Sequence, residues 1–170
     1  MIIVRHLTSC LCSPIAAGTL FSTLVALFGT VAVGRVLGLT QSNSLMLSQR
    51  CTSGGFAMLV CTMLNAPVAI MFMFNLASGL FGGCLGQLLL DKLGLRNDRS
   101  SGERICRGIA MGSSSHATGT ASLIQSGEEE TAAIASVSVV VCGVLHTVFC
   151  SAPPVRRLLL ALASGGAGGG

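Results

Sequence analysis

Charge is what this sequence has least of. Only 9% of its 170 residues are Asp, Glu, Lys or Arg, whereas a typical soluble domain has about 25%. Hydrophobic residues make up 51% of the chain. A soluble helix keeps a polar or charged face toward water, so this scarcity argues against a soluble helical domain. The composition predicts an integral membrane protein in contact with the lipid bilayer.

Tryptophan and tyrosine are absent altogether. Their absence removes side chains that nucleic-acid sites use for base stacking, and the basic residues are spread over short loops without forming one stripe. The net charge of +4 therefore does not indicate a nucleic-acid partner. The same absence removes the aromatic belt of many membrane proteins, without reversing the membrane interpretation.

Recognisable metal and catalytic motifs are also missing. The eight cysteines include no CxxC or Cys/His ligand spacing, and five lie in apolar tracts, so we expect small buried thiols. The serines beside His116 have no buried carboxylate to orient the imidazole, and no nucleophile-elbow pattern occurs. We therefore predict no catalytic residue, no metal, no cofactor and no enzymatic activity.

What the sequence does have is long uncharged tracts, at residues 6–34, 51–90, 108–127 and 131–155. A span needs about 20 apolar residues to cross about 30 Å of hydrocarbon, so these tracts predict four or five crossings. The fold class predicted is an all-α polytopic membrane protein with about five helical segments. We expect these segments at 14–34, 51–64, 67–90, 108–125 and 131–153, with a polar connector at 40–44 and a charged loop at 91–107.

Two of these segments, 51–64 and 108–125, are expected to be short or broken. The first has only about 14 residues, which reach about 21 Å as a helix, and both are rich in Gly, Ser and Thr. Each is followed by a long span, which gives a weak internal repeat. Paired interrupted segments of this kind point to the substrate site of a transporter.

The basic residues predict a topology. Arg35 and Arg50 flank one loop, five lie between residues 92 and 107, and two follow the last span at 156–157. Two full crossings between each group would place all nine on the cytoplasmic or stromal side, opposite Glu128–Glu130. A re-entrant short segment would change this parity, and the sequence leaves that alternative open.

We divide the chain into three parts. Residues 1–13 form a short N-terminal segment without a recognisable targeting signal. Residues 14–163 form the transmembrane domain, and residues 164–170 form a Gly-rich tail of low complexity that we expect to be disordered.

The candidate substrate-binding residues come from the two interrupted segments. A hydroxyl or imidazole in hydrocarbon needs a hydrogen-bond partner, a substrate or a water-filled cavity. Arg50, beside the first interruption, offers a guanidinium that can hold a carboxylate through two parallel hydrogen bonds. His116 has an alternative role as a structural bond to a neighbouring helix, and Arg50 has one as an interfacial anchor. The complete set is His116, Ser113, Ser114, Ser115, Thr118, Gly119, Thr120, Arg50, Thr52 and Ser53.

A family resemblance is carried by three motifs: Arg107-Gly-Ile-Ala110, Ser115-His-Ala-Thr-Gly-Thr-Ala121 and the glutamates at 128–130. Together they resemble the signature of the LrgB/CidB membrane family, and residues 49–51 and 90–96 resemble its plastid members. The resemblance implies an LrgB-like transmembrane domain at 14–163. It also implies a carrier that exchanges small 2-hydroxycarboxylates, glycolate and glycerate, across the plastid (chloroplast) inner envelope in photorespiration.

The bacterial members of the family imply an alternative function. They are described as regulators of murein hydrolase activity and cell lysis in the plasma membrane, and they work with a holin-like LrgA-type partner. The chain departs from the family pattern where Ser53-Gly-Gly-Phe-Ala57 replaces a proline-containing break and where residues 97–103 form an insertion. The first half of the usual domain is absent, so we expect a truncated gene model or a fragment. The resemblance implies a holin-like LrgA-type protein or a fused domain as the partner.

Overall fold

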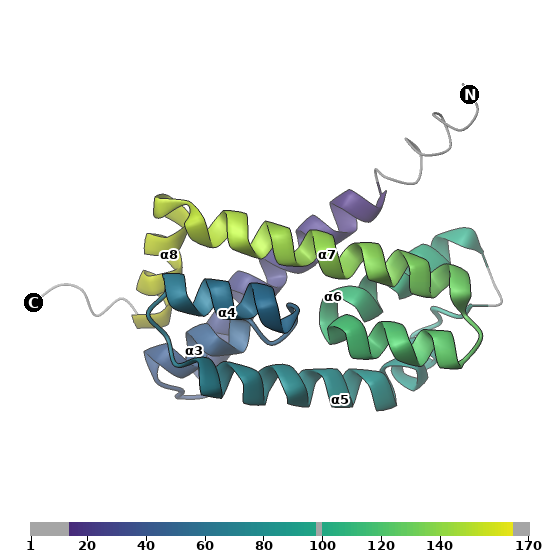
Figure 1. Ribbon diagram of the computed structural model, residues 1–170, viewed down its shortest axis with the longest axis horizontal. Helices are drawn as coiled ribbons and strands as arrows, with labels where there is room; N and C mark the ends of the chain where they lie inside the picture. Colours follow the sequence, from purple (N-terminus) through teal and green to yellow (C-terminus); the bar gives the residue numbers. More distant parts are fainter. Residues whose placement is uncertain (1–13, 98–99, 165–170) are drawn as a thin grey trace, which may run out of the picture.

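A computed structural model describes residues 14–97 and 100–164, and within these residues every regular element is helical. The predicted all-α fold of a polytopic membrane protein is confirmed (Figure 1). Residues 1–13, with Cys10 and Cys12, and most of the predicted tail lie outside the described residues.

Within the described residues, three helices are long and apolar enough to cross a membrane: Pro14–Val36, α5 (Val68–Lys92) and α7 (Glu129–Ser151). The first contains a π-helical turn, η1 (Val25–Gly29), and continues as α2 (Thr30–Val36). Each has 23 to 25 residues, or about 35 Å at 1.5 Å per residue, which matches the hydrocarbon thickness. The expected spans at 14–34, 67–90 and 131–153 are therefore present with nearly the expected bounds.

The first interrupted segment is one arm of a helical hairpin. The expected connector at 40–44 instead begins α3 (Gln41–Ser48), because the Thr40 hydroxyl accepts a hydrogen bond from the Asn43 N–H and caps the helix. After a turn at residues 49–53, α4 (Gly54–Met63) returns in the opposite direction. The open ends of both arms, at Gln41 and Leu64, line one small cavity, so this hairpin enters and leaves at the same end of the molecule.

The second interrupted segment is also a hairpin. α6 (Ser101–Gln125) breaks at His116, whose backbone has φ 42° and ψ −137°. A straight helix would separate Arg107 from Glu128, 21 residues later, by about 31 Å. Instead their side chains are 2.8 Å apart, so α6 turns back at His116 and ends beside its own start. We name its two arms α6a (residues 101–115) and α6b (residues 117–125). The expected charged loop at 91–107 is shorter than predicted, because Ser100 caps a helix that already includes Arg104 and Arg107.

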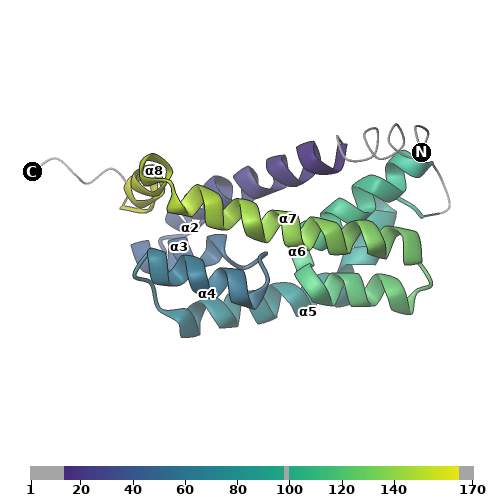
Figure 2. The ribbon, with the colours of Figure 1, turned by 45° about the horizontal axis from the view of Figure 1, so that its top comes forward.

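The five predicted segments therefore become three full spans and two half-length hairpins. The prediction of four or five crossings is wrong for 51–64 and 108–125, since both segments stop halfway and return. The first hairpin opens at the end where α5 begins, and the second opens at the end where α5 finishes (Figures 1 and 2). The weak internal repeat thus has inverted topology, a long helix followed by a hairpin in each unit, as in many secondary transporters.

Small residues allow the second hairpin to pack closely against α5 on one side and α7 on the other. A Cβ atom added to Gly82 on α5 would lie 1.6 Å from Ser115 Oγ, and one added to Gly112 on α6 would lie 2.3 Å from the Ala135 carbonyl on α7. Such approaches are the usual way for helices to associate in lipid.

The last described element is a short amphipathic helix, α8 (Pro153–Ser164), which lies at the same end as the first hairpin (Figure 1). Its buried Leu159 and Ala163 belong to the hydrophobic cluster that also contains Leu45 on α3 and Val60 on α4. This cluster therefore supports the base of the first hairpin, and Arg156 and Arg157 stay exposed beside it.

The predicted topology is wrong for the acidic turn. Glu128 pairs with Arg107 and Glu130 pairs with Arg104, so the glutamates lie on the same side as the basic residues at 92–107. Arg156 and Arg157 lie at the other end of α7, about 35 Å away. The physical reason is parity, because a hairpin returns to the side from which it entered. Arg99 lies outside the described residues.

Cysteine labelling tests this arrangement. In a cysteine-free background, Ser101→Cys and Glu129→Cys should react with an impermeant thiol reagent from the same face of sealed membranes. Arg157→Cys, the control, should react from the opposite face, and all three positions are exposed. Labelling of Ser101→Cys and Glu129→Cys from opposite faces would contradict the second hairpin.

Candidate functional site

The tips of the two hairpins meet beside Asn75 in α5. The Asn75 amide nitrogen donates to the carbonyl oxygen of Thr52 at 2.5 Å and to that of Arg50 at 3.4 Å. Its backbone carbonyl accepts a hydrogen bond from His116 Nε2 at 3.1 Å. One residue thus joins both breaks and satisfies carbonyl groups that an interrupted helix leaves without partners.

Sequence reasoning missed Asn75. The available signal was an amide side chain within the expected span 67–90, one of three amides in a 40-residue uncharged tract, with Asn65 and Gln87. A lone polar residue in a span is a candidate for an interhelical hydrogen bond, but its partners are backbone groups that the sequence does not identify.

A groove runs along α5 from the meeting point of the tips. Its volume is about 480 Å³, within the usual range for small-molecule sites. The polar part of its wall consists of Arg50, Ser78, Ser114 and Ser115, and apolar α5 side chains such as Phe81 line the rest. Four residues from three separate elements therefore form a polar patch inside a largely apolar groove.

A second cavity of about 280 Å³ lies on the other side of Arg50. Arg50 and Ser114 line both cavities, while Ser113, Cys51 and Ser22 line only the second. Arg50 therefore lies between two hollow regions, one against α5 and the other against the first helix.

The Arg50 guanidinium has no partner among the described residues: no hydrogen bond or ion pair of its side chain occurs there. Its side chain is half-buried at the tip of the first hairpin. This tip lies far from the ends of the three long spans, where an interfacial anchor would be expected. An unpaired positive charge at this depth is costly. A bound anion would lower that cost.

Two helix N-termini lie at the same tips. α4 begins at Gly54 directly after the first tip, and its N-cap, Ser53, makes no side-chain hydrogen bond to the helix. α6b begins directly after His116. The first N–H groups of a helix are unpaired and carry partial positive charge, which favours an anion. The tips thus add two positive dipole ends to the charge of Arg50.

The predicted hydroxyl residues differ in their availability. Ser113 and Ser114 donate to the carbonyl groups of Ile109 and Ala110, one turn earlier in α6a. Ser114 and Ser115 face each other with their Oγ atoms 3.1 Å apart. A hydroxyl that bonds its own helix can rotate toward a ligand, so these three serines remain groove donors.

The remaining predicted residues lie outside the two cavities, and these include the half-buried N-cap residue Ser53. Thr52 is buried and donates to the Gln49 carbonyl. Thr120 donates to the His116 carbonyl, and Gly119 packs against the Met111 carbonyl. Thr118 is exposed on α6b and lies against Gly83 of α5. The last four support the tips, and the structure does not bring them to the grooves.

His116 also lies outside both cavities. Its side chain is buried, and its Nε2–H donates to the Asn75 carbonyl. Its positive φ is unfavourable for a residue other than glycine, at a cost of about 1–3 kcal/mol. The hydrogen bonds of its imidazole and of its carbonyl therefore hold a strained break in place. This geometry favours the structural alternative for His116.

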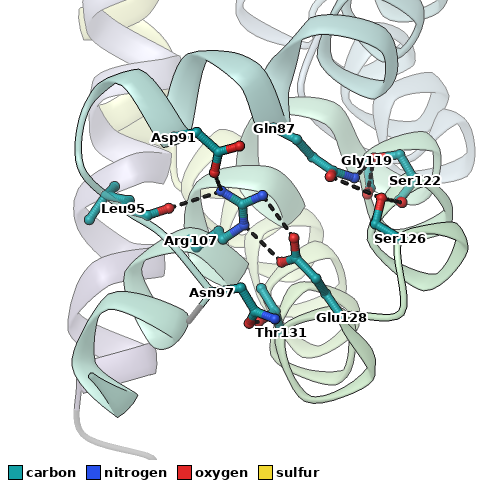
Figure 3. Close-up of polar contacts among 10 residues, drawn as sticks. All are labelled: Gln87, Asp91, Leu95, Asn97, Arg107, Gly119, Ser122, Ser126, Glu128 and Thr131. Atoms are coloured by element: carbon teal, nitrogen blue, oxygen red, sulfur yellow. Dashed lines mark hydrogen bonds and ion pairs between the residues drawn. The ribbon is translucent and has the colours of Figure 1, made fainter. Parts of the chain in front are cut away.

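The base of the second hairpin is held by a buried arginine, Arg107 (Figure 3). Its Nε and one terminal nitrogen donate to the two Glu128 oxygens, each at 2.8 Å. The other terminal nitrogen donates to Asp91 at 2.7 Å and to the Leu95 carbonyl at 2.9 Å. This guanidinium thus ties together the end of α5, the first arm of α6 and the start of α7. Beside it, Thr131 donates to the Asn97 side chain.

Comparisons with known proteins identify the family of the chain. The sequence model of the LrgB-like family matches residues 4–154, which is most of the chain. The chain belongs to the LrgB-like family. Arg107 and Glu128, which clamp the second hairpin, and His116 at its tip all come from the motifs that carry the resemblance. No solved structure matches the chain.

Two curated relatives are similar over most of this LrgB-like chain. It is 32% identical over 155 residues to the plastidal glycolate/glycerate translocator 1 of Arabidopsis thaliana, covering 87% of this chain and 28% of the relative. It is 28% identical over 148 residues to the uncharacterized protein YxaC of Bacillus subtilis, covering 87% of this chain and 59% of the relative. The chain therefore spans about a quarter of the first relative and more than half of the second.

The clamp at Arg107 predicts a large stability effect. Arg107→Ala leaves Glu128 buried without its partner, so the free energy of unfolding should fall by about 3–5 kcal/mol. Arg104→Ala is the matched control, because the pair of Arg104 and Glu130 is more exposed and should contribute less than about 1 kcal/mol. Thermal unfolding of the purified variants in detergent measures both. Equal effects of the two substitutions would contradict the clamp.

The break at His116 predicts a different pattern. His116→Ala should lower the melting temperature, because it loses the bond to Asn75 and keeps an unfavourable positive φ. His116→Gly should be less destabilising, by about 1 kcal/mol, since glycine tolerates this backbone conformation. Gln125→Ala, at the exposed end of α6b, should change stability little. A His116→Gly variant that melts below His116→Ala would argue against a strained break.

Proposed function

We propose that the chain forms the substrate-binding core of a membrane carrier for small 2-hydroxycarboxylates, with glycolate and glycerate as substrates. The observation that carries this proposal is the unpaired Arg50 guanidinium, which lines two cavities at the meeting point of two broken segments. Inverted units with discontinuous helices are typical of secondary transporters, whose sites lie at such breaks.

The chemistry of the groove suits a small hydroxycarboxylate. The Arg50 guanidinium can bind a carboxylate through two parallel hydrogen bonds, and the N-termini of α4 and α6b add further donors. The hydroxyls of Ser78, Ser114 and Ser115 are suited to the hydroxyl group of the substrate, because each can donate or accept. The chain's similarity to a protein named glycolate/glycerate translocator supports the same substrate class.

Binding by hydrogen bonds and charge also fits a carrier that makes no covalent intermediate. We therefore propose transport without catalysis, cofactor or metal. The plastid inner envelope is the proposed location, with a role in photorespiration, because one relative is plastidal. We also propose a separate or fused holin-like domain as the partner of the carrier, which rests on the family resemblance alone.

Transport assays with Arg50 variants test the proposal. Liposomes containing the complete protein should exchange external glycolate for internal labelled glycerate. Arg50→Ala should weaken the apparent affinity by about ten- to hundredfold, because it removes about 1.5–3 kcal/mol of charged hydrogen bonds. The apparent affinity of Arg50→Lys should lie between those of the wild type and of Arg50→Ala. Lysine keeps the positive charge but lacks the planar guanidinium that makes two parallel hydrogen bonds.

Arg157→Ala is the matched control, because this exposed arginine lies at the far end of α7 and should leave the affinity unchanged. Folding of each variant is checked by its melting temperature. Absence of exchange above empty vesicles by folded protein would favour the alternative function, regulation of murein hydrolases in a bacterial plasma membrane with a holin-like partner.

A further inference from the structure

Behind the tip of the first hairpin, two cysteines and a histidine are buried together. Cys51 directly follows Arg50, while Cys142 and His146 lie one turn apart on α7. The Cys51 sulfur is 4.0 Å from His146 Nε2, and the Cys142 sulfur is 3.5 Å from His146 Nδ1. The two thiols also contact each other. This cluster therefore joins the tip of the first hairpin to α7.

The hydrogen bonds of His146 fix the role of each ring nitrogen. Nδ1 lies 2.8 Å from the carbonyl oxygen of Cys142, which can only accept, so Nδ1 carries the proton. Nε2 then has a free lone pair directed at the Cys51 thiol. His146 is therefore positioned to take the proton of Cys51, and the resulting thiolate is the reactive form of cysteine.

Cys51 also has a route to a small reagent. Its side chain is almost fully buried by the protein, but it contributes to the wall of the 280 Å³ cavity beside Arg50 and Ser113. A small neutral oxidant such as hydrogen peroxide can enter a space of this size. Cys142 is completely buried and lines neither of these cavities, which makes it the resolving partner.

We propose that Cys51 and Cys142 form a peroxide-sensitive dithiol. The Cys51 thiolate attacks one oxygen of hydrogen peroxide, the O–O bond breaks, and the departing hydroxide takes the proton held by His146 to form water. Cys51 is now a sulfenic acid. The Cys142 sulfur then attacks the Cys51 sulfur and a second water leaves, so two thiols are oxidised to one disulfide and one peroxide is reduced to two waters.

The disulfide would bond the first hairpin tip to α7. Because Arg50 is the residue before Cys51, its guanidinium would lose freedom to follow a substrate between the two cavities. Oxidation should therefore lower the exchange rate, a consequence that rests on the proposed transport function. Formation of the disulfide itself does not depend on that function.

A second cysteine pair provides a matched control. Cys61 on α4 and Cys150 on α7 are also fully buried and belong to the same hydrophobic cluster. Neither has a recorded bond to histidine within the described residues, and neither lines the cavity beside Arg50. We compare two variants in nanodiscs, one with only Cys51 and Cys142 and the other with only Cys61 and Cys150, all other cysteines being replaced by serine.

After treatment with hydrogen peroxide, intact mass and peptide mapping should show a disulfide in the Cys51 and Cys142 variant. It should form at least about tenfold faster than any in the control pair, and adding His146→Gln should slow it at least about tenfold. Wild-type protein should give the same linked peptides, and Cys51→Ser should not. Equal rates for the two pairs, or unlinked Cys51 and Cys142 in folded wild-type protein after oxidation, would overturn the proposal.

Transport is measured separately in liposomes that contain the wild-type protein, before and after the same peroxide treatment. A disulfide that forms and lowers exchange, with recovery after a reducing agent is added, supports the regulatory consequence. A disulfide that forms without affecting exchange overturns that consequence and leaves the dithiol intact. Failure of exchange in the reduced protein would count against the proposed carrier, not against the dithiol.

Discussion

This architecture depends on hydrogen-bond partners for the backbone carbonyl and amide groups that the two helix breaks leave unpaired inside hydrocarbon. Each hairpin interrupts a helix halfway along the molecule, where an unpaired carbonyl or amide costs several kcal/mol. Asn75 meets that need at the first tip by donating to two backbone carbonyl groups, and its own carbonyl holds the second tip by accepting from the His116 imidazole. The glycines of α5 then allow the second hairpin to lie close enough for the bond to His116 to form.

The two arginines of the hairpins have opposite roles because their surroundings differ. Arg107 is buried and fully engaged by Glu128, Asp91 and a carbonyl group, so its charge is neutralised within the protein. Arg50 lies beside two cavities with no acidic partner among the described residues. The first arginine therefore fixes a hairpin in position, and the second leaves a positive charge available to a ligand.

The resulting site is built from parts far apart in the sequence. Ser78 comes from α5, Arg50 from the first tip, and Ser114 and Ser115 from the second. Polar residues at these positions are costly in a membrane protein unless a partner or a ligand compensates for them. Glu128, which follows α6, is also a buried polar residue with a compensating partner, because it forms an ion pair with Arg107. Much of the intramembrane polarity is therefore engaged within the described residues, and Arg50 is the exception that points to function.

The sequence by itself determined the membrane class, the three long spans and the two interrupted segments, because uncharged length and Gly, Ser and Thr content are local properties. It also singled out Arg50 and the serines at 113–115. Only the tertiary structure decided that both interrupted segments turn back, since the reversal depends on contacts such as Arg107 with Glu128 across 21 residues. The same reversal places the acidic turn at 128–130 on the side of the basic residues at 92–107, and not opposite them. The separation of His116 from the grooves was likewise decided in three dimensions, because a hydrogen bond to the Asn75 backbone leaves no trace in the identity of either residue.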